Sequence, residues 1–375
     1  MEIENDPSNL KIIDVSYLMK GKRSDSYSKT SNLILNEFLK SGYICIKGYG
    51  IPKKTIEYAY ISSEHFFSSS LEDKLKSISL DKARRGYSPF EAENYASLIG
   101  EKRQNDKVEK FRVGPELTSE NLLEPYYSCK LAKSFFFPNN WEHTTSDFKA
   151  SILDYYTWME KLTFDILSAL ECALNLPNCY FTGKMLQHTS ILTINYFEAI
   201  DISSNSEIIR IAEHTDVSML TIVSQSECSL RGGRLELYSI ETDRWVPFAF
   251  EDECFVVHVG DCLADWTGGM LKSTRHRVVS KSDSHSSTST STSTSTSTST
   301  STSTSRRQSE TSREEGSYNS SIELPLPDDR YSLAYFATPD YKAEIDLPIS
   351  KTSLEYHIWR KNRIKTAMKV LSSVS

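Results

Sequence analysis

Residues 254–280 read CFVVHVGDCLADWTGGMLKSTRHRVVS, and this stretch decides the fold class. Two short runs rich in β-branched residues, 254–259 and 275–280, flank a segment that contains Gly260-Asp261 and Gly268-Gly269. Short runs of this kind between clusters of Gly, Asp and Ser are typical of strands in an antiparallel sandwich or jelly roll. The stretch therefore predicts an antiparallel β core.

The same pattern continues on both sides of this stretch, in runs at 191–197, 219–224, 234–238, 245–248 and 332–336. The chain before residue 185 differs, because its apolar residues recur at steps of three and four, most clearly over 147–174. We predict a mainly β protein with flanking helices, built as one domain over 1–375. Within it we expect a helical segment at 1–185 that wraps the core, a jelly-roll core at 190–340 and a helix at 350–375.

The segment 281–322 is rich in Ser and Thr, and 286–305 is an almost perfect alternation of the two. It contains too few apolar side chains to offset the entropy lost on ordering, so we predict a disordered insertion. Long loops are tolerated because the entropy of loop closure grows slowly with length. We interpret the insertion as a tolerated surface loop, with a phosphorylatable tether as the alternative.

Composition excludes several functional classes. Hydrophobic residues make up 38% of the 375 residues, which is enough for a large core, and the net charge is −7 without basic runs. These values give no reason to expect a nucleic-acid or membrane partner. The polar start and the seven scattered cysteines favour a protein with reduced thiols in the cytoplasm, with the nucleus left open. We expect a monomer that acts on a small molecule.

Candidate metal ligands lie in the β region. In extended chain, residues i and i+2 point to the same side, so His214 and Asp216 can grip one ion, and His276 can supply a third ligand. Two histidines and one carboxylate form the arrangement that Fe(II) and O₂ chemistry uses. The alternative is a strand-end histidine hydrogen-bonded to a carboxylate. His258 is a rival ligand, which we interpret as a core histidine with satisfied hydrogen bonds.

Arg330-Tyr331-Ser332 is a candidate anion site. In a strand the guanidinium of Arg330 and the hydroxyl of Ser332 point the same way and can hold a carboxylate together. The alternative is a surface arginine that pairs with Asp328 or Asp329.

The order of these motifs is more specific than any one of them. The chain resembles the Fe(II)/2-oxoglutarate-dependent dioxygenases of the isopenicillin N synthase-like family. The segments that carry this resemblance are Asn195-Tyr196-Phe197, His214-Thr215-Asp216, Gly232-Gly233, Val259-Gly260-Asp261, Thr274-Arg275-His276-Arg277-Val278 and Arg330-Tyr331-Ser332, with Ile12-Ile13-Asp14, Gly50-Ile51-Pro52 and Arg85-Gly86-Tyr87 nearer the N-terminus.

The resemblance implies a double-stranded β-helix core and a particular set of site residues. His214, Asp216 and His276 would bind Fe(II), and O₂ would take an open position on the metal. The co-substrate 2-oxoglutarate would chelate the metal at its keto acid end and be converted to succinate and CO₂. The expected co-substrate residues are Arg330, Ser332, Asn195 and Tyr196, and the expected substrate residues are Arg85, Tyr87, Phe111, Phe197 and Phe336.

Two departures from the family pattern matter. Phe197 stands where many relatives place a tyrosine that hydrogen-bonds 2-oxoglutarate, so either Tyr196 substitutes for it or co-substrate affinity is lower. The insertion separates His276 from Arg330, and we expect it to loop out at a hairpin tip. Two other functions stay open: an oxidase of the isopenicillin N synthase type that works without 2-oxoglutarate, and a degenerate binding scaffold.

Overall fold

The computed structural model describes residues 11–20, 24–79, 85–99, 103–200, 207–226, 231–248, 253–281 and 328–373. The predicted Ser/Thr-rich insertion lies outside the described residues, except for Lys281, which is the last residue of a strand.

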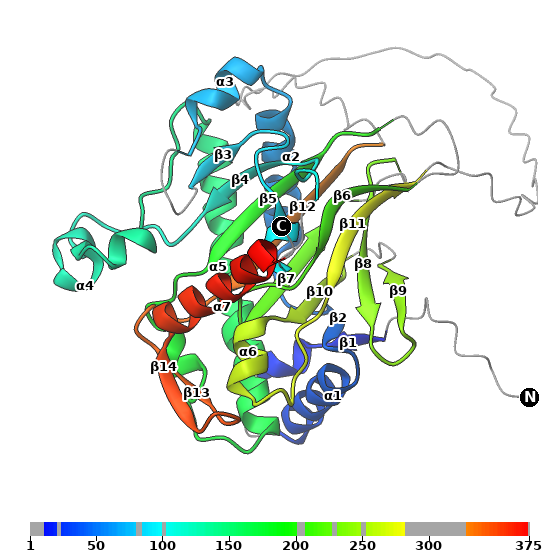
Figure 1. The fold of residues 1–375 in the computed structure, drawn as a ribbon, viewed down its shortest axis with the longest axis vertical. Helices are drawn as coiled ribbons and strands as arrows, with labels where there is room; N and C mark the ends of the chain where they lie inside the picture. The colour runs from blue at the N-terminus through cyan, green and yellow to red at the C-terminus, as the bar shows by residue number, and fades with distance from the viewer. Residues whose placement is uncertain are drawn as a thin grey trace, which may run out of the picture.

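Two β-sheets form the centre of the molecule (Figure 1). The large sheet has the strand order β1-β2-β10-β7-β12-β5-β4-β3 and the small sheet has the order β6-β11-β8-β9. All pairs are antiparallel except β1 with β2. The strands are β1 (Ile12–Asp14), β2 (Tyr43–Lys47), β3 (Gly86–Ser88), β4 (Glu109–Val113), β5 (Ile191–Phe197), β6 (Glu207–His214), β7 (Leu220–Gln225), β8 (Arg234–Ser239), β9 (Arg244–Pro247), β10 (Phe255–Val259), β11 (His276–Lys281) and β12 (Arg330–Ala337), with β13 (Glu344–Leu347) and β14 (Thr352–Glu355) in a separate pair.

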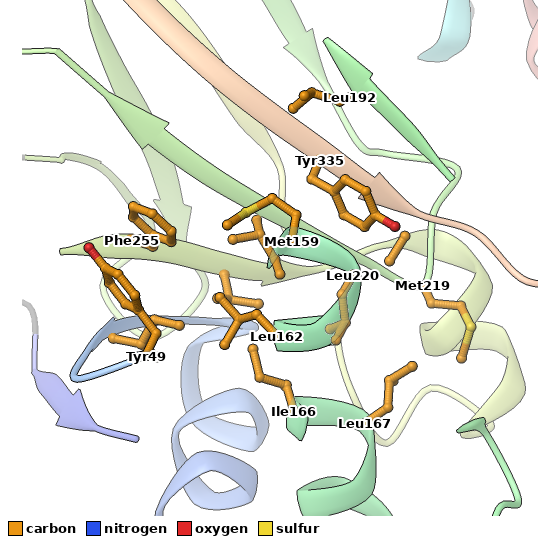
Figure 2. Packing of buried hydrophobic residues seen from close by; sticks show 14 of the residues in the cluster. Tyr49, Met159, Leu162, Ile166, Leu167, Leu192, Met219, Leu220, Phe255 and Tyr335 are labelled. Atoms are coloured by element: carbon orange, nitrogen blue, oxygen red, sulfur yellow. The ribbon is translucent and has the colours of Figure 1, made fainter. Parts of the chain in front are cut away.

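Helices cover one face of the large sheet. The longest helix, α5, begins after Thr145, whose side chain accepts a hydrogen bond from the amide of Phe148, and its apolar residues pack on β7 and β12. Figure 2 shows Met159, Leu162 and Ile166 of α5 near residues of the sheet. In the described part of the chain, no helix has the length and apolar character needed to cross a membrane. The helices are α1 (Asp25–Ser41), α2 (Lys53–Phe67), α3 (Leu71–Lys76), α4 (Pro125–Ser128), α5 (Ser146–Ala173), α6 (Asp261–Trp266) and α7 (Tyr356–Ser373).

The two faces of the large sheet contribute to different apolar clusters. Directly opposed residues of antiparallel strands share a face, and β12 pairs with β5 so that Tyr331 is opposite Tyr196 and Arg330 is opposite Phe197. Tyr331 and Tyr196 belong to the cluster that contains the helices, whereas Phe197 packs with residues of the small sheet such as Leu237. We call these the helix face and the inner face. The inner face lies between the two sheets, as expected for a jelly roll.

Four details of the predicted architecture were wrong. Besides helices and β2, whose strand character residues 43–47 indicate, the N-terminal residues 1–185 supply β1, β3 and β4 of the large sheet. The C-terminal helix begins at Tyr356, because the residues just before it form β14. Strand β6 was not predicted, and Asp216 lies in the connection between β6 and β7 rather than in a strand. Strands β11 and β12 belong to different sheets, so the segment between them is not a hairpin tip.

Candidate functional site

Three potential metal ligands converge on the inner face. His214 ends β6 and His276 begins β11, and these strands pair so that the two residues are directly opposite, with ring centroids 4.2 Å apart. The Asp216 Oδ1 atom lies 3.6 Å from His214 Nε2 and 3.7 Å from His276 Nε2. All three residues are buried, and each offers one ligand atom within 4.8 Å of the others.

Backbone carbonyls orient both imidazoles. His214 Nδ1 lies 2.8 Å from the carbonyl oxygen of Ala212, and His276 Nδ1 lies 3.0 Å from that of Thr274. A carbonyl oxygen only accepts hydrogen bonds, so each Nδ1 carries the proton and each Nε2 keeps a lone pair that faces Asp216. A neutral imidazole held in this tautomer is the form that binds metal ions.

The carboxylate of Asp216 is held from its other side. Its Oδ2 accepts a hydrogen bond of 2.6 Å from the hydroxyl of Thr221, which leaves Oδ1 facing the two histidines. Burial raises the pKa of Asp216 above its ordinary value and lowers the pKa of His214 well below its ordinary value. A divalent cation would stabilise both deprotonated forms, so the donor set fits such an ion.

His258 lies beside this group and is not the satisfied core histidine that we predicted. It is fully buried on β10, and neither ring nitrogen has a hydrogen-bond partner among the described residues. Its Nε2 lies 3.5 Å from Asp216 Oδ2, and its ring centroid lies 4.6 Å from that of His276. Sequence alone placed it in the core but could not place it against the carboxylate.

A candidate anion site lies on the same inner face. Arg330 is 1% exposed, which excludes the alternative of a surface arginine, and its Nη2 donates a hydrogen bond of 2.9 Å to Gln225 Oε1. Ser332 is next along the inner face, and the side-chain amide of Asn195 donates to its hydroxyl at 3.3 Å. Arg330, Ser332 and Asn195 are therefore brought together as the sequence predicted.

Tyr196 is not part of this group. It lies on the helix face of β5, where its ring packs against Phe67 and Tyr331. Its hydroxyl donates a hydrogen bond of 2.9 Å to Asp329 Oδ2. The placement of Tyr196 among the co-substrate residues was wrong, and so was the alternative that it substitutes for a tyrosine at position 197, because neighbouring residues of a strand point to opposite faces.

Three of the expected substrate residues also lie away from the inner face. Phe111 is fully buried and packs against Phe66 and Phe148 on the helix face, and Tyr87 is paired opposite Phe111. Arg85 is buried and donates to the carbonyl of Phe135. Tyr87 and Phe111 were misplaced for the reason that applies to Tyr196, whereas Arg85 precedes β3 and reaches the loop at Phe135.

Phe197 and Phe336 do lie on the inner face. Phe197 is opposite Arg330, and Phe336 is opposite Thr221, the residue that holds Asp216. Phe336 is half-buried, so it lies at the border of the group and solvent.

Residues that the sequence did not reveal border His214. The ring of Tyr95 lies 4.7 Å from the ring of His214, and the Lys110 ammonium lies 4.0 Å over the ring of Tyr95. Lys110 and Arg112 alternate with Phe111 along β4 and both form ion pairs with buried Glu93. The sequence of β4 shows that charged and apolar residues alternate, but it does not show whether the charged or the apolar set points to the inner face.

Comparisons with known proteins agree with this geometry. The model of the 2OG-Fe(II) oxygenase superfamily matches residues 188–295, and the model "non-haem dioxygenase in morphine synthesis N-terminal" matches residues 10–143. Proline hydroxylase buaE of Petromyces alliaceus is 28% identical over 247 residues, which cover 63% of this chain and 70% of the relative. The 2-oxoglutarate-dependent dioxygenase ucsF of an Acremonium species is 23% identical and covers 95% of this chain and 98% of the relative.

Solved structures show the same fold. A full-length Neurospora crassa protein in complex with alpha-KG matches with a TM-score of 0.69 at 20% identity, covering 97% of this chain and 98% of that chain. The rice dioxygenase for auxin oxidation matches with a TM-score of 0.62 at 16% identity, covering 95% of each chain.

The chain belongs to the 2OG-Fe(II) oxygenase superfamily. It is a non-haem Fe(II)- and 2-oxoglutarate-dependent dioxygenase, an oxidoreductase that uses O₂. The predicted family, the jelly-roll fold class and the predicted cofactors are thereby confirmed.

Proposed function

We propose that His214, Asp216 and His276 bind the Fe(II) and that Arg330, Ser332 and Asn195 bind the distal carboxylate of 2-oxoglutarate. The observation that carries the proposal is the convergence of two locked Nε2 atoms on one oxygen of Asp216, at 3.6 and 3.7 Å. A buried guanidinium and a hydroxyl on the same face suit a carboxylate, because charge-assisted hydrogen bonds are strong where water is excluded.

The chain's own residues have separable roles in this proposal. The carbonyls of Ala212 and Thr274 hold the protons on the Nδ1 atoms, and the Thr221 hydroxyl keeps Asp216 turned toward the histidines. Phe197 and the apolar residues between the sheets exclude water around Arg330. Bound Fe(II) supplies the redox chemistry with O₂ that amino-acid side chains lack.

We propose that the prime substrate is a small molecule that is hydroxylated or desaturated on the side of His214 where Tyr95 lies, with Lys110 over the ring of Tyr95 and Phe336 at the border of the inner face. Support comes from the contact of Tyr95 with His214 and from relatives named for proline hydroxylation and crystallised with thymine. The mixed aromatic and cationic border favours a polar molecule. We also propose a monomer in the cytoplasm, or also in the nucleus, without a nucleic-acid or membrane partner. The seven scattered cysteines support a reducing compartment, and the net charge of −7 without basic runs gives no attraction to nucleic acid or anionic lipid.

An anaerobic titration tests the proposed site directly. Protein loaded with Fe(II) is titrated with 2-oxoglutarate while the visible charge-transfer band of a metal-chelated keto acid is followed. We expect a saturable band that is lost in His276→Ala and that needs far more 2-oxoglutarate in Arg330→Met, with Fe(II) affinity unchanged in the latter.

Other results of this titration would overturn the proposal. A band that persists in His276→Ala would remove His276 from the metal site. An unchanged requirement for 2-oxoglutarate in Arg330→Met would remove Arg330 from the co-substrate site. Equal weakening of iron and 2-oxoglutarate binding in Arg330→Met would place Arg330 outside the pocket.

A further inference from the structure

A second buried arginine lies next to the proposed co-substrate site. Arg210 on β6 is 0% exposed. Its Nε donates to the carbonyl of Lys107 at 3.1 Å, and its Nη1 lies 3.1 Å from the Ser280 hydroxyl and 3.5 Å from the carbonyl of Arg231. Its Nη2 is buried and has no hydrogen-bond partner among the described residues. One donor of a buried cation therefore remains available.

A β-bulge turns Arg210 inward. Strand β11 pairs Val278 with Ile211 and Val279 with Ile209, so Arg210 is the extra residue on β6 between two successive pairs. Bulges change the direction of a side chain and recur next to active sites. Here the bulge places an arginine against Ser280 of β11, on the inner side of the small sheet.

Arg210 and Arg330 lie on the same aromatic ring although they belong to opposite sheets. The guanidinium carbon of Arg210 is 5.6 Å from the centre of the Phe197 ring, and that of Arg330 is 4.8 Å from it. Burial, and secondly the charge of Arg330, lower the pKa of Arg210 to about 10 against the opposing charges of Glu198 and Asp329, which leaves it protonated at neutral pH. Two cations thus share a small buried space.

No carboxylate in the described part of the chain forms an ion pair with Arg210. Arginines on the outer face of the same sheet behave differently. Arg234 and Arg277 both pair with Glu236, at 3.2 and 2.7 Å. Glu198 and Asp329 act on Arg210 without forming such a direct pair. A buried charge without a direct counter-ion is costly, so the contrast indicates that an anion from outside the chain supplies the missing partner.

We propose that Arg210 is a second anchor for the distal carboxylate of 2-oxoglutarate, donating through Nη2 beside Arg330 and Ser332. The inference rests on the proposed function of Arg330. It also accounts for Phe197, because a second guanidinium against its ring supplies the hydrogen-bond donor that a phenylalanine lacks. Arg210 in this view binds the co-substrate directly.

A pair of ligands separates this role from a purely structural one. 2-Oxopentanoate has a methyl group in place of the distal carboxylate of 2-oxoglutarate and chelates iron in the same way. Both ligands are titrated anaerobically into Fe(II)-loaded protein, with dissociation constants taken from the charge-transfer band. The variants are Arg210→Met, Arg210→Gln, Arg330→Met and, as a matched control on the outer face, Arg277→Met.

We expect Arg210→Met to weaken 2-oxoglutarate about 10- to 100-fold and 2-oxopentanoate less than about twofold, with unchanged Fe(II) affinity. Arg277→Met should change none of these constants. Arg210→Gln keeps a donor for the neighbouring carbonyls, so it provides the same comparison if the methionine variant does not fold.

Equal losses for the two ligands, or no loss of 2-oxoglutarate affinity, would overturn the role of Arg210. If Arg330→Met weakens 2-oxoglutarate while Arg210→Met does not, this inference fails and the proposed function stands. If neither variant weakens 2-oxoglutarate, both fail together.

Discussion

Alternate residues of strand β12 serve two different purposes. Tyr331, Leu333 and Tyr335 point to the helix face and pack in the cluster that contains α5. Arg330 and Ser332 point to the inner face, together with Asn195 and Phe197 of the neighbouring strand. The helix face is mostly apolar and closed by helices, whereas the inner face carries the buried His214, Asp216, His276 and Arg330. A single strand can therefore contribute to stability with one set of side chains and to ligand binding with the other.

The comparison implies that substitutions on the two faces have different signatures. A change on the helix face should alter the free energy of unfolding and leave ligand affinities alone. A change on the inner face should alter the affinity for iron or 2-oxoglutarate more than it alters unfolding.

Phe111→Ala should produce the largest effect on the helix face. Removal of this fully buried ring leaves a cavity beside Phe66 and Phe148, so we expect the free energy of unfolding to fall by about 3–5 kcal/mol. Urea unfolding measures the loss. The dissociation constants of Fe(II) and 2-oxoglutarate, measured on folded protein, should change less than about twofold. A selective rise in the KM of the prime substrate would show that Phe111 lines the substrate pocket, as the sequence analysis expected.

The inner face should make the metal-free protein sensitive to acid. Burial lowers the pKa of His214 and of His258 well below the ordinary value of 6.5, so below this pH the unfolded chain binds protons that the folded chain does not. Stability should therefore fall as the pH drops from 7 to 5.5, by about 1 kcal/mol for each histidine.

Asp216 acts in the opposite direction. Burial raises its pKa from 3.8, so the folded state binds a proton at Asp216 more readily than the unfolded chain does. Protonation of Asp216 therefore opposes the loss of stability, and its contribution grows as the pH falls. Urea midpoints at several pH values test the net effect, with His65→Ala, an exposed histidine on α2, as the control. Stability that stays flat from pH 7 to 5.5 in the wild-type protein would contradict burial of neutral imidazoles.

Thr221→Val tests the support of the carboxylate on the inner face. Valine keeps the shape but removes the hydroxyl that donates to Asp216 Oδ2 at 2.6 Å. Loss of such a partner should weaken Fe(II) binding about 10-fold, measured by anaerobic titration. Thr193→Val is the matched control, because the Thr193 hydroxyl on β5 is buried without a hydrogen-bond partner among the described residues. Equal effects of the two variants would remove Thr221 from the metal site.

Tyr196→Phe should have the smallest effect. It compares the helix face with the inner face within the segment Asn195-Tyr196-Phe197. It removes the hydrogen bond to Asp329 on the helix face, so the free energy of unfolding should fall by about 1 kcal/mol. The affinity for 2-oxoglutarate should not change, although the neighbouring residue Phe197 lies on the inner face. A higher dissociation constant for 2-oxoglutarate in this variant, measured from the charge-transfer band, would show that Tyr196 contacts the co-substrate.

Much of the site was predictable because its parts are short and chemically distinctive. His214 and Asp216 could be paired from their spacing, and the resemblance carried by the order of the motifs added His276, Arg330 and Ser332. Helix α5 was predictable from its apolar periodicity. These patterns are local in the sequence, so they can be recognised without knowledge of the fold.

Strand β6 was not predictable in the same way. Its apolar residues Ile208, Ile209 and Ile211 are interrupted by Arg210, and the bulge breaks the alternation by which half-buried strands are found. The functional candidate Arg210 was missed for the same reason, since a charged residue in an apolar run is normally expected to point to solvent.

The sequence by itself determined the β core, the order of the motifs and the identity of the residues with metal-binding and carboxylate-binding chemistry. Only the tertiary structure decided which of two neighbouring residues faces inward: Lys110 or Phe111, Phe197 or Tyr196. The reason is physical, because both faces of the large sheet are buried and apolar residues suit either. Direction is then set by the layers that pack on each face, which the local sequence does not contain.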